Sequence, residues 1–358
     1  MENYSILSQA QEILPSILLL IVPTALLCLL FSSNRKFFYS HDYQAVQKIH
    51  DQPVSRLGGL AIFLTFGTAA YFFNNTILIN IILCSIPLFF VGLIEDLMHN
   101  VRPQIRMIAI LISALIFIFP LYQNAGLPQI EIPVIGVYLN NSIAFALFLI
   151  IAISGVANGV NMIDGANGLS GFSVLTILIA ISFIAFQKND LDVLVASCIL
   201  LAAVIGFLLI NYPWGKVFLG DAGAYFLGFA ISILTIYLYS RNDSLPSWGA
   251  ILILFYPVME VIFSFTRKKL IQKKTPFAPD TEHLHLKLFF VLKESIKVNW
   301  IANSFVTPSL ALIWLMPPLF SMITFGSIKA IWICISMSTL IYLGIYLALP
   351  KITNRTKR

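Results

Sequence analysis

Residues 217–229 read VFLGDAGAYFLGF, and the chain stays largely apolar from there to about residue 240. Asp221 therefore stands at the start of a long apolar segment. Residues 91–97 (VGLIEDL) and 158–169 (NGVNMIDGANGL) also place acidic residues at the end of an apolar run. A carboxylate at a membrane boundary is costly unless it meets a cation, a polar partner or water. These three ends are therefore candidates for one functional site.

The composition indicates a membrane protein. Of the 358 residues, 59% are hydrophobic and 11% are charged, and the mean hydropathy is +0.89, whereas soluble domains have about 25% charged residues. We expect an all-α, polytopic membrane protein that forms a single integral membrane domain over residues 1–358. The predicted spans number about eleven, and they cover residues 13–31, 57–73, 77–94, 105–122, 142–159, 170–186, 191–211, 222–240, 247–266, 299–320 and 328–349.

The basic residues predict the orientation. With the N-terminus outside, only Lys188, Arg241 and Lys329 of the 22 Lys and Arg residues fall on outer segments. The positive-inside rule then places the C-terminus in the cytoplasm. The same orientation brings several candidates to the cytoplasmic face: Glu95, Asp96, Asp164, Asp221, His283 and His285. The net charge of +6 is thus mainly a topology signal, and nucleic-acid binding is not expected.

Two segments between spans suggest local structure. Residues 126–141 (GLPQIEIPVIGVYLNN) alternate partly in hydrophobicity, which predicts a short β-hairpin on the outer face. Residues 267–298 form the longest cytoplasmic loop, and we expect a small amphipathic element within it.

The segment 158–169 carries polar residues at a fixed spacing, because Asn158, Asn161, Asp164 and Asn167 recur every three residues. This spacing lines one side of a helix or turn, and Gly165 permits close approach of the backbone to a ligand. A polar loop with Asx turns would also explain the pattern. A ligand or metal site is the interpretation we favour.

The other acidic ends allow two interpretations each. Asp221 is either a helix cap or, given its flanking glycines, a carboxylate that holds Mg²⁺ against a pyrophosphate. The pair Glu95–Asp96 is either an interfacial charge pair or a catalytic pair in which one acid is a base and an arginine holds the other. We favour the metal-binding interpretation for Asp221 and the catalytic interpretation for Glu95–Asp96.

The basic loop after Arg267 is typical of contact with lipid headgroups. His283 and His285 are less easily explained in this way, since two imidazoles close to several cations can bind phosphate oxygens. Glu260 lies within the preceding apolar run, so it needs a partner or a wet cavity.

Five motifs in this order resemble one known family: SRLGGLAIF (55–63), GLIEDL (92–97), NGVNMIDGANGL (158–169), VFLGDAGAYFLGF (217–229) and TPFAPDTEHLHLKL (275–288). The family is that of the polyprenyl-phosphate N-acetylhexosamine-1-phosphate transferases, or glycosyltransferase family 4. The resemblance implies transfer of a sugar 1-phosphate from a UDP-sugar to undecaprenyl phosphate, with release of UMP. It also implies a bacterial inner-membrane enzyme in contact with the lipid bilayer, with its active site facing the cytoplasm, and it is compatible with a homodimer.

The resemblance also implies roles for particular residues. The catalytic candidates are Glu95, Asp96, Asp164 and His283. The substrate-binding candidates are Asn158, Gly165, Asn167, Arg267 and His285. Asn161 and Asp221 are the candidate ligands of Mg²⁺, for which Mn²⁺ can substitute.

The chain departs from the family pattern at three motifs. Glu95 replaces the first residue of a paired aspartate, Asn167 replaces the second acid of a DGxDG motif, and Leu286 replaces a histidine. These departures argue against the muramoyl-pentapeptide branch, and they leave the donor sugar open. Two alternatives from other classes are a secondary transporter, which would need acids near the bilayer midplane, and an inactive homologue that acts as a membrane scaffold.

Overall fold

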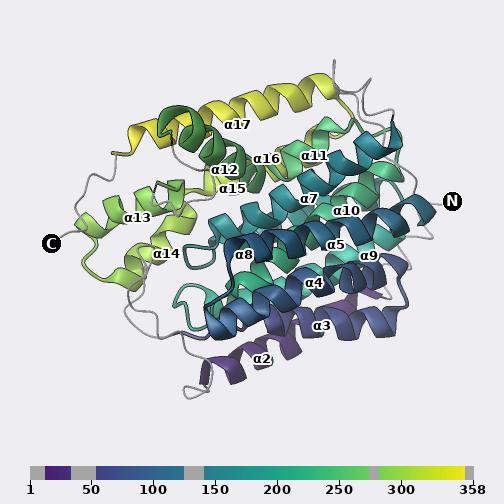
Figure 1. Cartoon of the computed structure of the whole chain (residues 1–358), viewed down its shortest axis with the longest axis horizontal. Helices are drawn as coiled ribbons and strands as arrows, with labels where there is room; N and C mark the ends of the chain where they lie inside the picture. Colours follow the sequence, from purple (N-terminus) through teal and green to yellow (C-terminus); the bar gives the residue numbers. More distant parts are fainter. Residues whose placement is uncertain (1–12, 34–53, 125–140, 274–281, 351–358) are drawn as a thin grey trace.

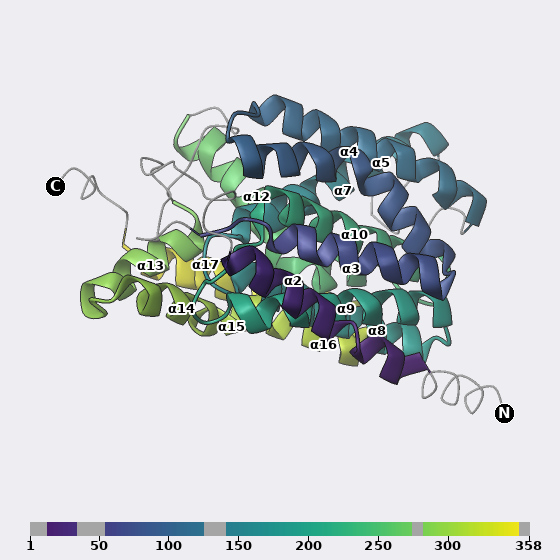
Figure 2. The same ribbon diagram turned by 90° about the horizontal axis from the view of Figure 1, so that it is seen from below.

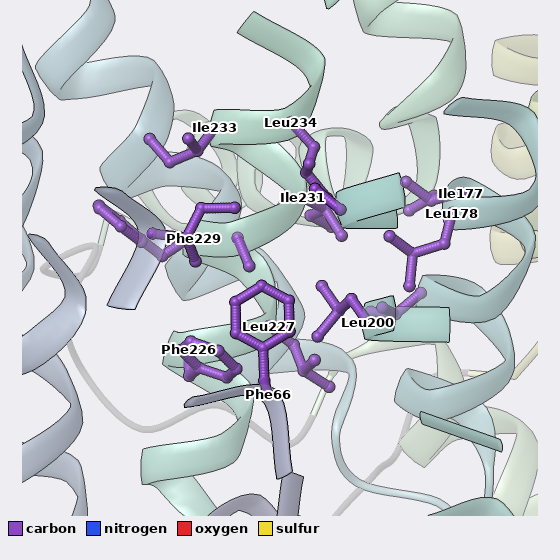
Figure 3. Close-up of a cluster of buried hydrophobic side chains, with 14 of the residues drawn as sticks. Phe66, Ile177, Leu178, Leu200, Phe226, Leu227, Phe229, Ile231, Ile233 and Leu234 are labelled. Carbon is purple, nitrogen blue, oxygen red and sulfur yellow. The ribbon is translucent and has the colours of Figure 1, made fainter. Parts of the chain in front are cut away.

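The apolar run after Leu219 forms α10 (Gly220–Ser240), which lies at the centre of a bundle of helices (Figure 1). The computed structural model describes residues 13–33, 54–124, 141–273 and 282–350. Within the most apolar window of α10, 94% of the residues are buried. A helix that is apolar on all sides is suited to such a buried position. Figure 3 shows its side chains, among them Phe226 and Leu227, pointing into a cluster with residues of neighbouring helices such as Phe66 and Leu200.

Seven helices surround α10 or pack on its neighbours: α2 (Ile21–Ser33), α3 (Gly58–Phe73), α4 (Thr76–Met98), α5 (Pro103–Asn124), α7 (Ser142–Ile163), α8 (Leu169–Gln187) and α9 (Leu191–Asn211). Small residues let the helices approach closely, as is common between helices in membranes. A Cβ added to Gly92 would lie 2.6 Å from the Cα of Ala222, and one added to Gly228 would lie 2.6 Å from the Cα of Ala157. The helix α2 is seen lying along α3 and α9 in Figure 2.

The outer helices expose apolar side chains. Only 17% of the most apolar window of Ile13–Ser33 and 22% of that of α17 (Ile328–Ala348) are buried. Leu19 and Leu347, for example, are 69% and 79% exposed. Such surfaces are stable in lipid but not in water, so the chain is a multi-pass membrane protein.

The number of spans is lower than predicted when helices are judged by length and hydropathy. Among the described residues, 8 helices are long and apolar enough to cross a membrane, or 9 if a bent pair counts as one span. The bent pair consists of Asn299–Ser309 and Ala311–Thr324, at an angle of 43°. The prediction of about eleven spans is therefore not confirmed, although each of the predicted ranges falls on helical structure.

Besides this bent pair, two further predicted spans are not single long helices. The range 247–266 is divided into α11 (Trp248–Ile253) and α12 (Phe255–Thr266). Pro257 is a physical reason for this break, because it has no N–H to donate to the carbonyl of Ile253. The predicted span over 57–73 is α3, whose 16 residues are short for a bilayer of about 30 Å.

A second, smaller core lies at one end of the bundle. It joins α13 (Leu284–Ser295) and α14 (Asn299–Ser309) to α12 and α17 through buried side chains such as Tyr256, Leu284 and Tyr342. The helix α13 lies within the loop 267–298, where a small element was expected. The same loop starts with the π-helix η1 (Arg267–Ile271). The predicted hairpin over 126–141 lies outside the described residues except for its last position. Among the described residues no β-strand is present; the one bridge pairs Ser55 with Val217.

Candidate active site

The Asp96 carboxylate, from the last turn of α4, holds the start of α10. Its two oxygens accept hydrogen bonds from the backbone N–H groups of Asp221 and Ala222, both at 2.9 Å. The first N–H groups of a helix have no partner within the helix and favour a negative charge. The approach requires a glycine at position 220, because its φ is +77° and an added Cβ would lie 2.5 Å from Asp96 Oδ2. Asp96 thus caps α10 from another helix.

Arg56 is the counter-ion that the acidic residues share. The backbone before α3 pairs with the backbone before α10, since the Phe218 N–H donates to the Ser55 carbonyl at 2.8 Å. This places Arg56 Nε 3.5 Å from Asp96 Oδ1 and its Nη2 3.5 Å from Asp221 Oδ1. Burial opposes the charge of Arg56, but the surrounding carboxylates outweigh burial and raise its pKa. Acidic residues from all three apolar-segment ends act electrostatically on this one guanidinium.

The Asp221 carboxylate is held by two arginines. Arg106 Nη1 contacts Asp221 Oδ2, and the same nitrogen lies 3.8 Å from Glu95 Oε1. Glu95 is fixed in turn by the Val101 N–H, which donates to Glu95 Oε2 at 2.8 Å. Arg106 thus links Glu95 to Asp221. Asp221 lies in the first turn of α10 without capping it.

The loop between α7 and α8 brings Asp164 to the same site. The Ser170 hydroxyl donates to Asp164 Oδ1 at 2.5 Å. Burial of the carboxyl group among protein atoms raises the pKa of Asp164 to about 7. The hydrogen bond from Ser170 and the positive charge of Arg56 oppose this rise. One turn earlier, the Asn161 amide donates to the Tyr225 hydroxyl at 3.1 Å. Since Tyr225 follows Asp221 by four residues on α10, Asn161 lies on the same side of that helix as Asp221.

The histidines close the site from α13. A Cβ added to Gly165 would lie 2.1 Å from His285 Nε2, so the loop backbone and this imidazole are in direct contact. Burial lowers the pKa of His285 to about 3, which keeps the ring neutral at physiological pH. His283 Nδ1 lies 2.9 Å from Glu260 Oε1, and the Tyr342 hydroxyl donates to Glu260 Oε2 at 2.8 Å. The prediction that Glu260 needs a partner is confirmed.

Asn167 points away from the acidic cluster. Its amide donates to the Pro213 carbonyl at 2.9 Å and to the Ser304 hydroxyl at 3.2 Å, and its backbone N–H donates to Asn303 Oδ1 at 2.7 Å. These bonds tie the loop after α7 to α14. In this arrangement Asn167 holds the loop in place, while its predicted contact with substrate stays a prediction.

Arg267 and Asn158 make contacts with other groups. Arg267 Nη1 donates to the Glu282 carbonyl at 2.7 Å and to the Tyr346 hydroxyl at 2.8 Å. It therefore joins η1 to the start of α13 and to α17. The Asn158 amide contacts the Met162 sulfur at 3.6 Å, within its own helix. Substrate binding by either residue stays a prediction.

The donor set can be compared with the needs of a divalent cation. Within the described residues, no three His, Cys, Asp or Glu side chains are grouped as metal ligands. Magnesium, however, is usually held by one or two carboxylates together with water and substrate phosphates. Asp221 and the amide oxygen of Asn161 supply oxygen donors of this kind on one side of α10. Asp221 and Asn161 are therefore suitable ligands for a divalent cation, and the binding of Mg²⁺ or Mn²⁺ here stays a prediction.

The fold and the site define a multi-pass helical membrane protein with a polar site at one end of its bundle. The family model for "Glycosyl transferase family 4" matches residues 78–239. The chain is 31% identical over 242 residues to the undecaprenyl-phosphate alpha-N-acetylglucosaminyl 1-phosphate transferase of Thermotoga maritima, over 67% of this chain and 69% of that protein. The chain belongs to glycosyl transferase family 4.

Other relatives carry related names. The chain is 26% identical over 253 residues to the probable undecaprenyl-phosphate N-acetylglucosaminyl 1-phosphate transferase of Bacillus subtilis, over 69% of each chain. It is 29% identical over 207 residues to the phospho-N-acetylmuramoyl-pentapeptide-transferase of Streptococcus agalactiae, over 56% of this chain and 59% of that protein. Relatives of both the N-acetylglucosaminyl and the muramoyl-pentapeptide type thus match.

Sequence reasoning assigned no role to three residues that the structure places in the site. Arg56 was visible only as part of the SRLGG motif, Arg106 only as a support for Glu95, and Ser170 not at all. Arg56 and Arg106 reach Asp221 across 165 and 115 positions of the chain. A basic residue two positions before a glycine pair, at the start of an apolar run, was the one available signal.

Proposed function

We propose that this protein transfers a sugar 1-phosphate, from UDP-N-acetylglucosamine or a related UDP-N-acetylhexosamine, to undecaprenyl phosphate and releases UMP. The product would start the synthesis of a cell-envelope polysaccharide. The observation that carries the proposal is the cluster of Asp96 and Asp221 around Arg56 at one end of an apolar bundle, with Glu95 joined to Asp221 through Arg106. Asp164 acts electrostatically on the same guanidinium. Membership of glycosyl transferase family 4 supports it, as do the names of the relatives.

The reaction is a displacement at phosphorus. An oxygen of the prenyl phosphate attacks the β-phosphorus of the UDP-sugar, the bond from that phosphorus to the bridging oxygen breaks, and UMP leaves with the electron pair. The bond between the sugar and its phosphate stays intact, so the anomeric configuration is retained. Catalysis of such a step depends mainly on positioning and on neutralising charge.

The residues divide this work between them. Asp221 and Asn161 would hold the divalent cation, which supplies charge stabilisation for the transferring phosphoryl group when it is bound. Asp96 fixes the start of α10 and with it the position of Asp221. Asp164, whose pKa is raised by burial to about 7, is suited to exchange a proton with the acceptor phosphate.

The histidine side of the site would contact the donor. His285 is neutral and lies against Gly165, so it can bind a phosphate oxygen or the nucleotide through one N–H without adding charge. His283 is paired with Glu260, which fixes the ring and its tautomer. We therefore place the nucleotide between the loop at Gly165 and the start of α13.

The site would face the cytoplasm of a bacterial inner membrane. The distribution of Lys and Arg supports this orientation, and the donor UDP-sugar would come from that compartment. The acceptor would reach the site laterally from the bilayer, because its prenyl chain is apolar. A homodimer is compatible with this arrangement.

A donor screen tests the proposal. Purified protein with undecaprenyl phosphate and Mg²⁺ is given one UDP-sugar at a time, and UMP release and a butanol-extractable glycolipid are measured. One donor should give both products in equal amounts, and Asp221→Asn at matched abundance should give neither. Absence of both products with every UDP-N-acetylhexosamine would favour the inactive scaffold, and uptake of a solute into vesicles would favour the transporter.

A further inference from the structure

Arg106 is shared between two carboxylates. Its Nη1 contacts Asp221 Oδ2 directly and lies 3.8 Å from Glu95 Oε1. Its Nε is buried and, among the described residues, has no hydrogen-bond partner. The side chain is 21% exposed, so water screens it only in part. Arg106 is thus bound on one side of its guanidinium while another N–H group remains unpaired.

The position of Arg106 conflicts with metal binding at Asp221. A divalent cation and a guanidinium are both positive, so they repel each other when both contact the same carboxylate. Arg56 does not need to move, because it lies 3.5 Å from both Asp221 and Asp96 and the backbone pairing at Ser55 holds it. Arg106, which contacts Asp221 directly, is therefore the cation that metal binding would displace.

Glu95 is placed to receive it. The Val101 N–H fixes Glu95 Oε2 at 2.8 Å, which leaves Oε1 directed towards Arg106. A movement of about 1 Å converts the present 3.8 Å separation into a hydrogen-bonded ion pair of about 2.8 Å. The cost of leaving Asp221 is offset by this new pair.

We propose that Arg106 is a positioning residue that occupies Asp221 when the site is empty and moves to Glu95 when a divalent cation binds Asp221. This rests on the proposed function, in which Asp221 is a metal ligand. After the move, Arg106 would stay beside the cation, where we expect a diphosphate oxygen to bind. Guanidinium groups bind phosphate oxygens through two parallel N–H groups. The exchange thus couples metal binding to the readiness of the site for a diphosphate.

The test measures Mn²⁺ affinity by electron paramagnetic resonance, with the purified full chain in detergent and no substrate. Arg106→Gln removes the competing cation, so Mn²⁺ should bind about fivefold more tightly, the change expected for losing a partly exposed ion pair. Arg102→Gln, at an exposed position four residues earlier, is the matched control and should leave the affinity unchanged. Thermal unfolding of each variant confirms that it is folded.

A double-mutant cycle separates the exchange from a general effect of charge. Glu95→Gln should weaken Mn²⁺ binding when Arg106 is present, because the displaced guanidinium has lost its new partner. In the Arg106→Gln background the same change should have almost no effect. Additive effects, an unchanged or weaker affinity in Arg106→Gln, or no Mn²⁺ binding to the wild-type protein would overturn the inference. Predicted affinities without turnover of any UDP-sugar would contradict the proposed function alone.

Discussion

Replacing Asp96 with Asn should destabilise the protein, whereas replacing Asp221 with Asn should mainly remove activity. Asp96 accepts two backbone hydrogen bonds at the start of α10 and is completely buried as a side chain. Asn has one acceptor oxygen, so one of these bonds is lost and its NH₂ group faces a backbone N–H. The charge that favours the helix terminus is lost as well.

The magnitude follows from these contacts. A hydrogen bond to a charged group contributes about 1.5–3 kcal/mol, and a buried donor without a partner costs a similar amount. Asp96→Asn should therefore lower the free energy of unfolding by roughly 2–4 kcal/mol. Asp221→Asn weakens the contacts with Arg56 and Arg106, whose side chains are 32% and 21% exposed and keep access to water. Arg106 also has Glu95 as a second partner 3.8 Å away. Its cost should stay near 1 kcal/mol.

Thermal unfolding in detergent, followed by intrinsic fluorescence, measures the difference. The Tm of Asp96→Asn should fall by about 6 °C, while Asp221→Asn should lie within about 2 °C of the wild type and lack transferase activity. Asp192→Asn, which breaks an exposed pair with Arg241 at the other end of the bundle, is the control for loss of one carboxylate. Equal Tm values for Asp96→Asn and Asp221→Asn would refute the capping role of Asp96.

The remaining predictions concern the loop between α7 and α8. If Asp164 acts as a carboxylate, the transfer rate should rise with pH through about 7, the pKa to which burial raises this group. Because the hydrogen bond from Ser170 favours the charged form, Ser170→Ala should move the inflection of the pH–rate profile to higher pH. An unmoved inflection would assign the titration to another group. Gly165→Ala should cut the transfer rate by more than about tenfold, since the added Cβ would lie 2.1 Å from His285 Nε2. The control Gly155→Ala should be active, because nothing lies within 4 Å of the Cβ added there. Similar rates in the two variants would show that catalysis does not require the close contact between Gly165 and His285.

The sequence predicted the helical class and the positions of most helices because hydropathy dominates in a membrane. It could not predict which apolar runs break. The run 247–266 is uninterrupted in hydropathy, yet the missing N–H of Pro257 divides it into α11 and α12. Glu260 was recognised as needing a partner, because an isolated buried carboxylate is too costly. That the partners are His283 and Tyr342 depends on how α12, α13 and α17 pack.

The acidic site was only partly predictable for the same reason. The predicted orientation alone places the apolar-segment ends that carry Asp96, Asp164 and Asp221 on the same face of the membrane. Their division of work could not, since capping of α10 by Asp96 depends on a helix crossing at Gly92 and Ala222. The position of Arg56 in the site depends on the pairing of Ser55 with Phe218, which lies far along the chain. Asn167, part of the regular Asn spacing, turns instead towards α14.

The central claim, transfer of a sugar together with its phosphate, is tested most directly with a doubly labelled donor. UDP-N-acetylglucosamine carrying ³²P at the β-phosphate and ³H in the sugar is incubated with the protein and undecaprenyl phosphate. If that sugar is the donor, both labels should enter the lipid in a one-to-one ratio, and unlabelled UMP should remain in water. If the screen identifies another UDP-N-acetylhexosamine, the same labels are placed in that donor. Sugar label in the lipid with ³²P left in soluble UDP would contradict the account, because it would show ordinary glycosyl transfer.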